Sequence, residues 1–160
     1  MEPVIRNTKL ETLKENLLRL NEETKTKLSN FIVNILVSGD DMTTVSAEIF
    51  ERAICSNLFG IFAELCLRLT YKFGDEFRKP LLYWCKQKLF EPAPAPVADR
   101  IISAYGVNSW KHSRADTISF IGKLFKVELI DNDFVNVCLE YLQNTKDFSS
   151  VAELQSATNL

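Results

Sequence analysis

Residues 76–91 have the sequence EFRKPLLYWCKQKLFE, and this stretch decides the fold class. Its apolar residues recur at steps of three and four, which places four of them on one helical face: Phe77, Leu81, Cys85 and Leu89. Polar residues separate them, so the pattern predicts an amphipathic helix that runs to about residue 90. Pro80 stands within it and removes one backbone hydrogen bond, at a cost of about 3 kcal/mol in a helix interior. The helix therefore either begins near Lys79 or is kinked at Pro80.

The same periodicity continues on both sides of this stretch. It predicts helices over about residues 8–20, 28–36, 43–54, 58–73, 97–105, 113–126, 132–142 and 147–157, with a break at residues 106–108. No stretch alternates with a period of two for long enough to predict a strand. Helices paired at about forty-residue spacing favour an all-α fold of stacked antiparallel helical hairpins, a HEAT-like α-solenoid. A plain bundle of six or seven helices stays open as the alternative.

Polar residues and one glycine mark expected features of these helices. Asn57 is expected to cap the helix that follows it, Thr43 or Thr44 the preceding one, and Asp131 a later one. Gly122 lies inside a helix, where glycine costs about 1 kcal/mol relative to alanine. We therefore expect Gly122 to permit a close approach between two helices.

Residues 91–96, EPAPAP, form the low-complexity stretch of the chain. Alternating prolines predict an extended, polyproline-like connection between two helices. This connection is too short to separate two domains, so we expect residues 1–160 to form a single HEAT-like helical domain.

The composition is that of an ordinary globular protein, with 46% hydrophobic and 25% charged residues. No apolar run approaches the roughly 20 residues that cross a bilayer, and the N-terminus lacks the apolar core of a signal peptide. We therefore expect a cytoplasmic protein without a membrane partner. The four cysteines contain no C-x-x-C pair, and Cys66, Cys85 and Cys138 are expected to be reduced core thiols.

Nothing in the sequence predicts catalysis. His112 is the single histidine, and no nucleophile, phosphate-binding or metalloprotease motif accompanies it. We therefore expect a protein that is not an enzyme, with no cofactor and no metal site.

The net charge of −2 conceals an uneven distribution of charged side chains. Residues 68–126 carry eleven basic and five acidic side chains, a net charge of +6. Residues 1–67 and 127–160 have net charges of −3 and −5. A basic middle between acidic ends favours an acidic partner, which is either RNA phosphate or an acidic protein surface. A solvated face without a partner is the alternative.

Four short segments, taken in order, resemble the middle domain of the eukaryotic initiation factor 4G family. Residues 49–54, IFERAI, are similar to the family's I-F-E-K-A-I, and residues 63–66, AELC, to its A-x-x-C. Eight residues match the family's N-F-R-K-x-L-L-x-x-C-Q-x-E-F-E helix: Phe77, Arg78, Lys79, Leu81, Leu82, Cys85, Phe90 and Glu91. Residues 120–126, FIGKLFK, match F-I-G-E-L-F-K with one charge changed.

This resemblance covers roughly residues 10–145, about the first three hairpins of a domain that usually has five. It implies a HEAT-repeat scaffold, as the N-terminal part of a longer middle domain. It also implies a non-catalytic role in translation initiation or mRNA metabolism, with a DEAD-box helicase such as initiation factor 4A, or other initiation factors, as partners. The later hairpins help the family to hold this helicase, and they have no counterpart in these 160 residues. A small stand-alone adaptor that recognises peptide motifs or dimerises is the alternative.

Basic residues interleaved with aromatic ones give the candidate binding site for a protein partner or RNA. The predicted residues are Arg78, Lys79, Lys86, Lys88, Trp110, Lys111, Arg114, Lys123 and Lys126. Trp84 and Tyr105 lie between them as further aromatic side chains. An RNA-binding module that uses this basic central surface is the other alternative function.

Overall fold

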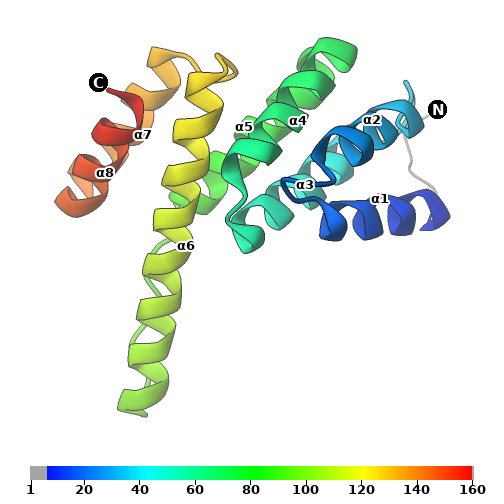
Figure 1. Ribbon diagram of the computed structural model, residues 1–160. Helices are drawn as coiled ribbons and strands as arrows, with labels where there is room; N and C mark the ends of the chain where they lie inside the picture. Colours follow the sequence, from blue (N-terminus) through cyan, green and yellow to red (C-terminus); the bar gives the residue numbers. More distant parts are fainter. Residues whose placement is uncertain (1–6, 160) are drawn as a thin grey trace. The chain divides into compact units, whose positions relative to one another are not determined.

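The computed structural model describes residues 7–159, which form eight helices and no strand (Figure 1). The helices are α1 (Asn7–Arg19), α2 (Lys25–Ile35), α3 (Met42–Ser56), α4 (Phe59–Phe73), α5 (Asp75–Leu89), α6 (Arg100–Lys126), α7 (Asn132–Asn144) and α8 (Phe148–Thr158). The predicted all-α class is confirmed.

The chain divides into two compact units, one that ends at Trp84 and one that begins at Cys85. The division falls inside α5, which contributes its first turns to one unit and its last turn to the other. The expectation of a single domain stays a prediction.

In the first unit, α1 packs against α2 and α3, and α4 packs against the same two helices. Each of the four helices contributes side chains without solvent exposure to the core, among them Leu13, Ile32, Ile49 and Phe62. These residues fall on the apolar stripes that the sequence predicts. Burial of each such side chain stabilises the fold by about 1.5–3 kcal/mol.

In the second unit, α8 packs against both α6 and α7. Gly122 of α6 faces α8, and a Cβ atom placed on it would lie 2.7 Å from the Cβ of Ala157. Real Cβ atoms do not approach other atoms so closely, so the contact requires glycine. The predicted close approach at Gly122 is confirmed.

The segment between α5 and α6 is extended, as the prolines predict. Residues 91–97 have no regular hydrogen-bonded structure, and we call residues 91–99 the strap. Pro94 of the strap lies close to α6, 3.6 Å from where a Cβ atom on Gly106 would stand. Trp110 fixes the start of the strap, because its Nε1–H donates to the carbonyl oxygen of Glu91 at 2.8 Å.

The predicted break at residues 106–108 is wrong, because α6 runs without interruption for 27 residues. A single glycine lowers helix propensity by only about 1 kcal/mol, and the contact of Gly106 with Pro94 favours continuation. We call residues 100–110 the arm. The arm extends beyond α7 and α8, with the strap running beside it (Figure 1).

Two predicted helix caps are also wrong. Asn57 ends α3 in the left-handed conformation (φ 61°), which asparagine tolerates better than most residues. Leu58 takes the N-cap position of α4. Asp41 caps α3, and its carboxylate accepts hydrogen bonds from the backbone N–H groups of Thr43 and Thr44. Asp131 caps α7 as predicted, accepting from the N–H of Phe134.

Helix α5 begins at Asp75, so the first of the two predicted alternatives, a start near Lys79, is wrong, and the second, a kink at Pro80, stays a prediction. Pro80 therefore lies in the helix interior. The predicted apolar stripe is confirmed, since all four of its side chains are fully buried: Phe77, Leu81, Cys85 and Leu89. This burial offsets the hydrogen bond that Pro80 removes.

The cysteines follow the prediction. All four are free thiols, of which Cys66, Cys85 and Cys138 are buried and Cys55 is exposed. Burial raises the pKa of Cys66 above its ordinary value and that of Cys138 to about 12. The buried thiols therefore behave as small apolar side chains.

Candidate functional site

The nine predicted site residues fall into groups of different accessibility. Arg78 and Lys79 belong to the first unit, and the other seven belong to the second. Four of the nine are exposed: Lys79, Lys111, Lys123 and Lys126. Four are half-buried: Arg78, Lys86, Lys88 and Trp110. Arg114 is buried, with 4% of its surface exposed.

The half-buried basic residues of α5 already have partners within the chain. Arg78 lies 3.7 Å from the carboxylate of Asp75, and Lys88 lies 3.1 Å from that of Glu91. The ammonium group of Lys86 stands 5.2 Å from the centre of the Phe134 ring. These contacts are partly solvated and contribute little to stability, but they lower the freedom of the three cations to meet an external partner.

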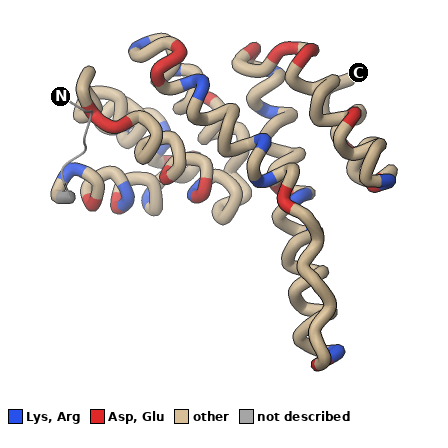
Figure 2. The backbone as a smooth tube through the Cα atoms, turned by 180° about the vertical axis from the view of Figure 1, so that it is seen from behind, with Lys and Arg blue, Asp and Glu red and all other residues tan. Residues whose placement is uncertain are grey.

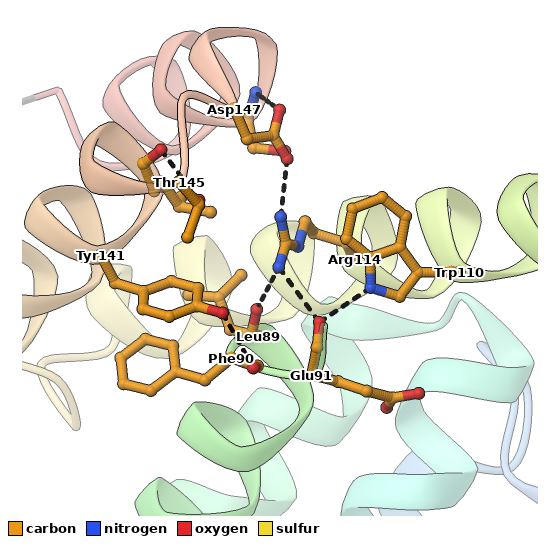
Figure 3. A network of polar contacts seen from close by, with 10 residues as sticks. Leu89, Phe90, Glu91, Trp110, Arg114, Tyr141, Thr145 and Asp147 are labelled. Atoms are coloured by element: carbon orange, nitrogen blue, oxygen red, sulfur yellow. Dashed lines mark hydrogen bonds and ion pairs between the residues drawn. The ribbon is translucent and has the colours of Figure 1, made fainter. Parts of the chain in front are cut away.

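Arg114 is the centre of a polar cluster in the second unit (Figure 3). Its Nη1 donates to Oδ2 of Asp147 at 2.8 Å, which joins α6 to the N-terminus of α8. Its Nη2 donates to the carbonyl oxygens of Leu89 and Glu91, at 2.9 and 3.2 Å. Leu89 is the last residue of α5 and Glu91 begins the strap. A cation near the C-terminus of a helix also complements its dipole.

Aromatic side chains enclose this guanidinium (Figure 3). Its central carbon stands 4.4 Å from the ring centre of Trp110 and 6.0 Å from that of Tyr141. Tyr141 also stacks on Phe90 at 4.1 Å and donates its hydroxyl to the Phe90 carbonyl oxygen at 2.9 Å. The last carbonyls of α5 therefore receive donors from both α6 and α7.

Asp147 remains ionised because of its hydrogen bonds. Partial burial raises the pKa of its carboxyl group, but the hydrogen bonds from Arg114 and Ser150 outweigh burial and hold the pKa below the ordinary value. The same carboxylate caps α8 by accepting from the N–H of Ser150. One side chain thus serves as helix cap and counter-ion.

The cluster changes the roles of two predicted site residues. Arg114 is an interior residue whose Nη1 and Nη2 groups donate to Asp147 and to the carbonyl oxygens of Leu89 and Glu91, so we assign it to the fold and not to a binding surface. Trp110 lies within α6 and not between two helices as predicted, and its indole N–H already donates to the carbonyl oxygen of Glu91. The sequence contains one signal of this pairing, since Asp147 precedes a helix at a position typical of an N-cap.

Trp84 is likewise engaged within the fold. Its Nε1–H lies 3.1 Å from Oγ of Ser46 and 3.3 Å from the carbonyl oxygen of Thr43, both in the first turns of α3. Its ring meets that of Tyr83 edge to face, with 5.0 Å between centres. Tyr105 of the arm differs, because 75% of its surface is exposed.

The exposed lysines of α6 form the remaining candidate surface of the second unit, which we call the lysine face. It consists of Lys111, Lys123 and Lys126. At 100° per residue, the three lie within about 120° around the helix axis and span about 22 Å along it. Lys123 and Lys126 stand in the last turn of α6, where positive charge complements the helix dipole.

A carboxylate lies next to the lysine face. Asp116 is half-buried, and burial raises its pKa above the ordinary value, an effect that nearby His112 partly opposes. Asp116 thus partly neutralises the positive charge at the middle of α6. Figure 2 shows the charges of the chain on its backbone.

Two features of the described part of the chain bear on metals and membranes, the grouping of metal-binding side chains and the length and apolarity of the helices. Among residues 7–159, no group of three or more His, Cys, Asp or Glu side chains is placed to hold a metal ion. No helix within the same residues is long and apolar enough to cross a bilayer.

Comparison of the chain with protein-family models, with curated proteins and with solved structures gives no match.

Proposed function

We propose that this chain is a non-catalytic helical scaffold that binds an acidic protein surface through the lysine face. The single observation that carries the proposal is the placement of Lys111, Lys123 and Lys126, exposed and on one side of α6. Clustered cations on a rigid helix raise the rate of association with an acidic partner and fix its orientation. Three cations of α5 (Arg78, Lys86 and Lys88) and Arg114, in contrast, have partners within the chain.

We further propose that the fold is a HEAT-like stack of helical hairpins. The packing of the first unit supports this, because α1 and α2 contact each other, as do α3 and α4, while α1 also contacts α3 and α2 also contacts α4. Successive hairpins in such a stack pack in this layered way. The four segments that resemble the initiation factor 4G middle domain support the same proposal.

On the basis of this resemblance we propose a DEAD-box helicase of the initiation factor 4A type as the first candidate partner, and a role in translation initiation or mRNA metabolism in the cytoplasm. Lys123 stands where the family's F-I-G-E-L-F-K motif has an acidic residue. That difference makes the end of α6 more basic than the family pattern. It favours a partner surface that is richer in carboxylates at this point.

The direct test is capture of purified initiation factor 4A by the immobilised chain. We expect the parent chain to retain the helicase at low salt. The triple variant Lys111→Glu, Lys123→Glu and Lys126→Glu should lose at least about tenfold in captured helicase, because three attractive contacts become repulsive. The variant should stay folded, since exposed charges contribute little to stability. Glu at positions 123 and 126 should lower that stability slightly, because it opposes the dipole of α6.

A matched control distinguishes local from global charge effects. Lys27 of α2 and Lys146 after α7 are also exposed, and neither belongs to the lysine face. The double variant Lys27→Glu and Lys146→Glu should capture the helicase as the parent does. Equal capture by the triple variant and the parent would contradict the role of the lysine face, and no capture by the parent would contradict the choice of helicase.

RNA is a second candidate, favoured by the exposed ring of Tyr105 on the same helix as the lysine face. Tyr105 precedes Lys111 by six residues, which is about 9 Å along the helix axis. A gel shift with single-stranded RNA, repeated at several salt concentrations, tests it. RNA binding should weaken steeply with salt and should depend on Tyr105 as well as on the lysines. Binding of the helicase should not depend on Tyr105.

A further inference from the structure

The strap is fixed to the second unit at its first residue. The carbonyl oxygen of Glu91 accepts hydrogen bonds from Nε1–H of Trp110 at 2.8 Å and from Nη2 of Arg114 at 3.2 Å. Further along, Pro94 packs against Gly106 of the arm. Every residue of the strap is exposed to solvent. The two donors of α6 therefore hold the strap where it begins, close to the end of α5.

The hold of Arg114 on the strap depends on α8. Only 4% of the surface of Arg114 is exposed, and its anionic partner is Asp147, the N-cap residue of α8, at 2.8 Å. Removal of one partner from a buried ion pair is strongly destabilising, because the other charge is left unpaired. In the described part of the chain, the Nε–H of Arg114 is also buried and meets no acceptor, which weakens the arrangement further. The guanidinium therefore stays inside only while α8 keeps this carboxylate in place.

We infer that Arg114 and Asp147 form a latch, through which the docking of α8 controls the order of the strap and the arm. In the closed state, which Figure 3 shows, α8 holds Arg114 and Arg114 holds Glu91. When the first turn of α8 withdraws, the unpaired guanidinium moves out to water and releases the carbonyl oxygen of Glu91. The strap then separates from the arm, which loses its contact with Pro94. We call this the open state.

The arm is the part of α6 that can respond to this release. It extends beyond α7 and α8, and its residues Ile101 and Tyr105 are 81% and 75% exposed. The later part of α6, in contrast, buries Phe120 and Leu124 completely in the second unit. Segments with few buried apolar contacts open at the lowest free energy. The arm can therefore open while the rest of the second unit stays folded.

The latch would also regulate the lysine face, a consequence that rests on the proposed function. Lys111 follows Trp110 directly and precedes Arg114 by three residues, so it stands where the arm meets the latch. In the open state Lys111 would no longer be held on the same side of α6 as Lys123 and Lys126. A partner that contacts all three lysines therefore binds the closed state better and closes the latch, and this coupling is reciprocal.

Distances between two spin labels, measured by double electron–electron resonance, test the latch in the full chain. The labels are attached at Ala95→Cys of the strap and Asn136→Cys of α7, both exposed positions, in a Cys55→Ser background that removes the exposed thiol. The parent should give a narrow distribution of distances. Asp147→Asn should give a broad one, because Asn still caps a helix but cannot pair with a guanidinium.

Asp131→Asn is the matched control for this change. Asp131 caps α7 in the same unit by accepting from the N–H of Phe134, and it lies outside the latch. The substitution is therefore chemically the same, and the distribution should stay as narrow as in the parent. Equal broadening in Asp131→Asn and Asp147→Asn would overturn the inference, because the strap would then respond to any loosening of the second unit.

A double variant separates opening of the latch from loss of the fold. Arg114→Met with Asp147→Asn leaves no unpaired charge in the interior, so it should melt at a higher temperature than Asp147→Asn alone. It still lacks the guanidinium that holds Glu91, so its distance distribution should be broad. Amide hydrogen exchange over residues 101–110 should be at least about tenfold faster than in the parent.

A strap that stays as ordered in the double variant as in the parent, with unchanged exchange in the arm, would overturn the inference. This outcome can be read even if Asp147→Asn alone fails to fold. The measurements contain no helicase, so their failure is distinguishable from failure of the capture test.

Discussion

Arg114 illustrates how the role of a side chain depends on which hydrogen-bond acceptors around it lack other donors. In sequence it lies among basic and aromatic residues and resembles part of a binding surface. In the structure its donors meet Asp147 and the carbonyl oxygens that end α5. Those carbonyls lack helical partners, and the strap that follows cannot supply donors from its prolines. The sequence contains both halves of this pairing, but a separation of 33 residues hides that they meet.

Gly122 gives the sharpest test at the scale of single residues. Gly122→Ala should destabilise the chain by about 1–3 kcal/mol, because the new Cβ would stand 2.7 Å from that of Ala157, and Gly122→Leu should cost at least as much. Gly60→Ala is the matched control. Gly60 lies in helix α4 with no atom within 4 Å of its added Cβ, so this variant should be stabilised by up to about 1 kcal/mol. A melting temperature for Gly122→Ala that rises together with that of Gly60→Ala would contradict the close contact between Gly122 and Ala157.

Asp147 gives a prediction about pH. Its pKa is lower in the folded chain than in the unfolded chain, where it is about 3.9, so its stabilising effect is present at neutral pH and is lost as the pH falls through the folded pKa. Asp147→Asn should therefore lower stability by about 2 kcal/mol at pH 7. The difference from the parent should shrink below about pH 4. Denaturant titrations of both proteins between pH 7 and pH 3 would show this, and a difference that stays constant with pH would contradict it.

At the scale of helices, the sequence predicts those features that depend on the residues of one short segment. The buried stripe of α5 was predictable because its four apolar residues repeat with the helical period, and the extended strap was predictable from its prolines. The uninterrupted α6 was not predictable. A glycine such as Gly106 usually indicates a break, and the sequence does not show that Pro94 packs against it. Asn57 and Asp41 show the same limit, since an Asn or Asp can serve either end of a helix depending on the backbone around it.

The N-terminus of α6 gives the prediction at this scale. The carboxylate of Asp99 accepts hydrogen bonds from the N–H groups of Ile101 and Ile102, at 2.9 and 3.1 Å. Asp99→Ala should therefore cost about 1 kcal/mol of helix stability at the arm. Hydrogen exchange measured by mass spectrometry should become faster for amides of residues 101–110 and stay unchanged for residues 114–126, which pack in the second unit. Equal acceleration in both segments would contradict the view that the arm opens by itself.

At the scale of the whole chain, charge is distributed unevenly along α6. Residues 101–110 of the arm carry no charged side chain, whereas Lys123 and Lys126 of the lysine face lie at the other end of this helix. The net charge of +6 over residues 68–126 predicted a basic region but not its accessible part. Accessibility depends on which cations find partners inside the fold, and Arg114 with Asp147 shows that these partners come from distant segments.

The affinity of the chain for initiation factor 4A at a series of salt concentrations tests the central proposal most directly. For the parent chain, the logarithm of the dissociation constant should rise steadily with the logarithm of the salt concentration, because salt screens the lysine face. The Lys111→Glu, Lys123→Glu and Lys126→Glu variant should bind at least about tenfold more weakly at low salt, and its affinity should not fall as salt rises. A variant that binds as tightly as the parent, with the same dependence on salt, would contradict the proposal that the lysine face binds the partner.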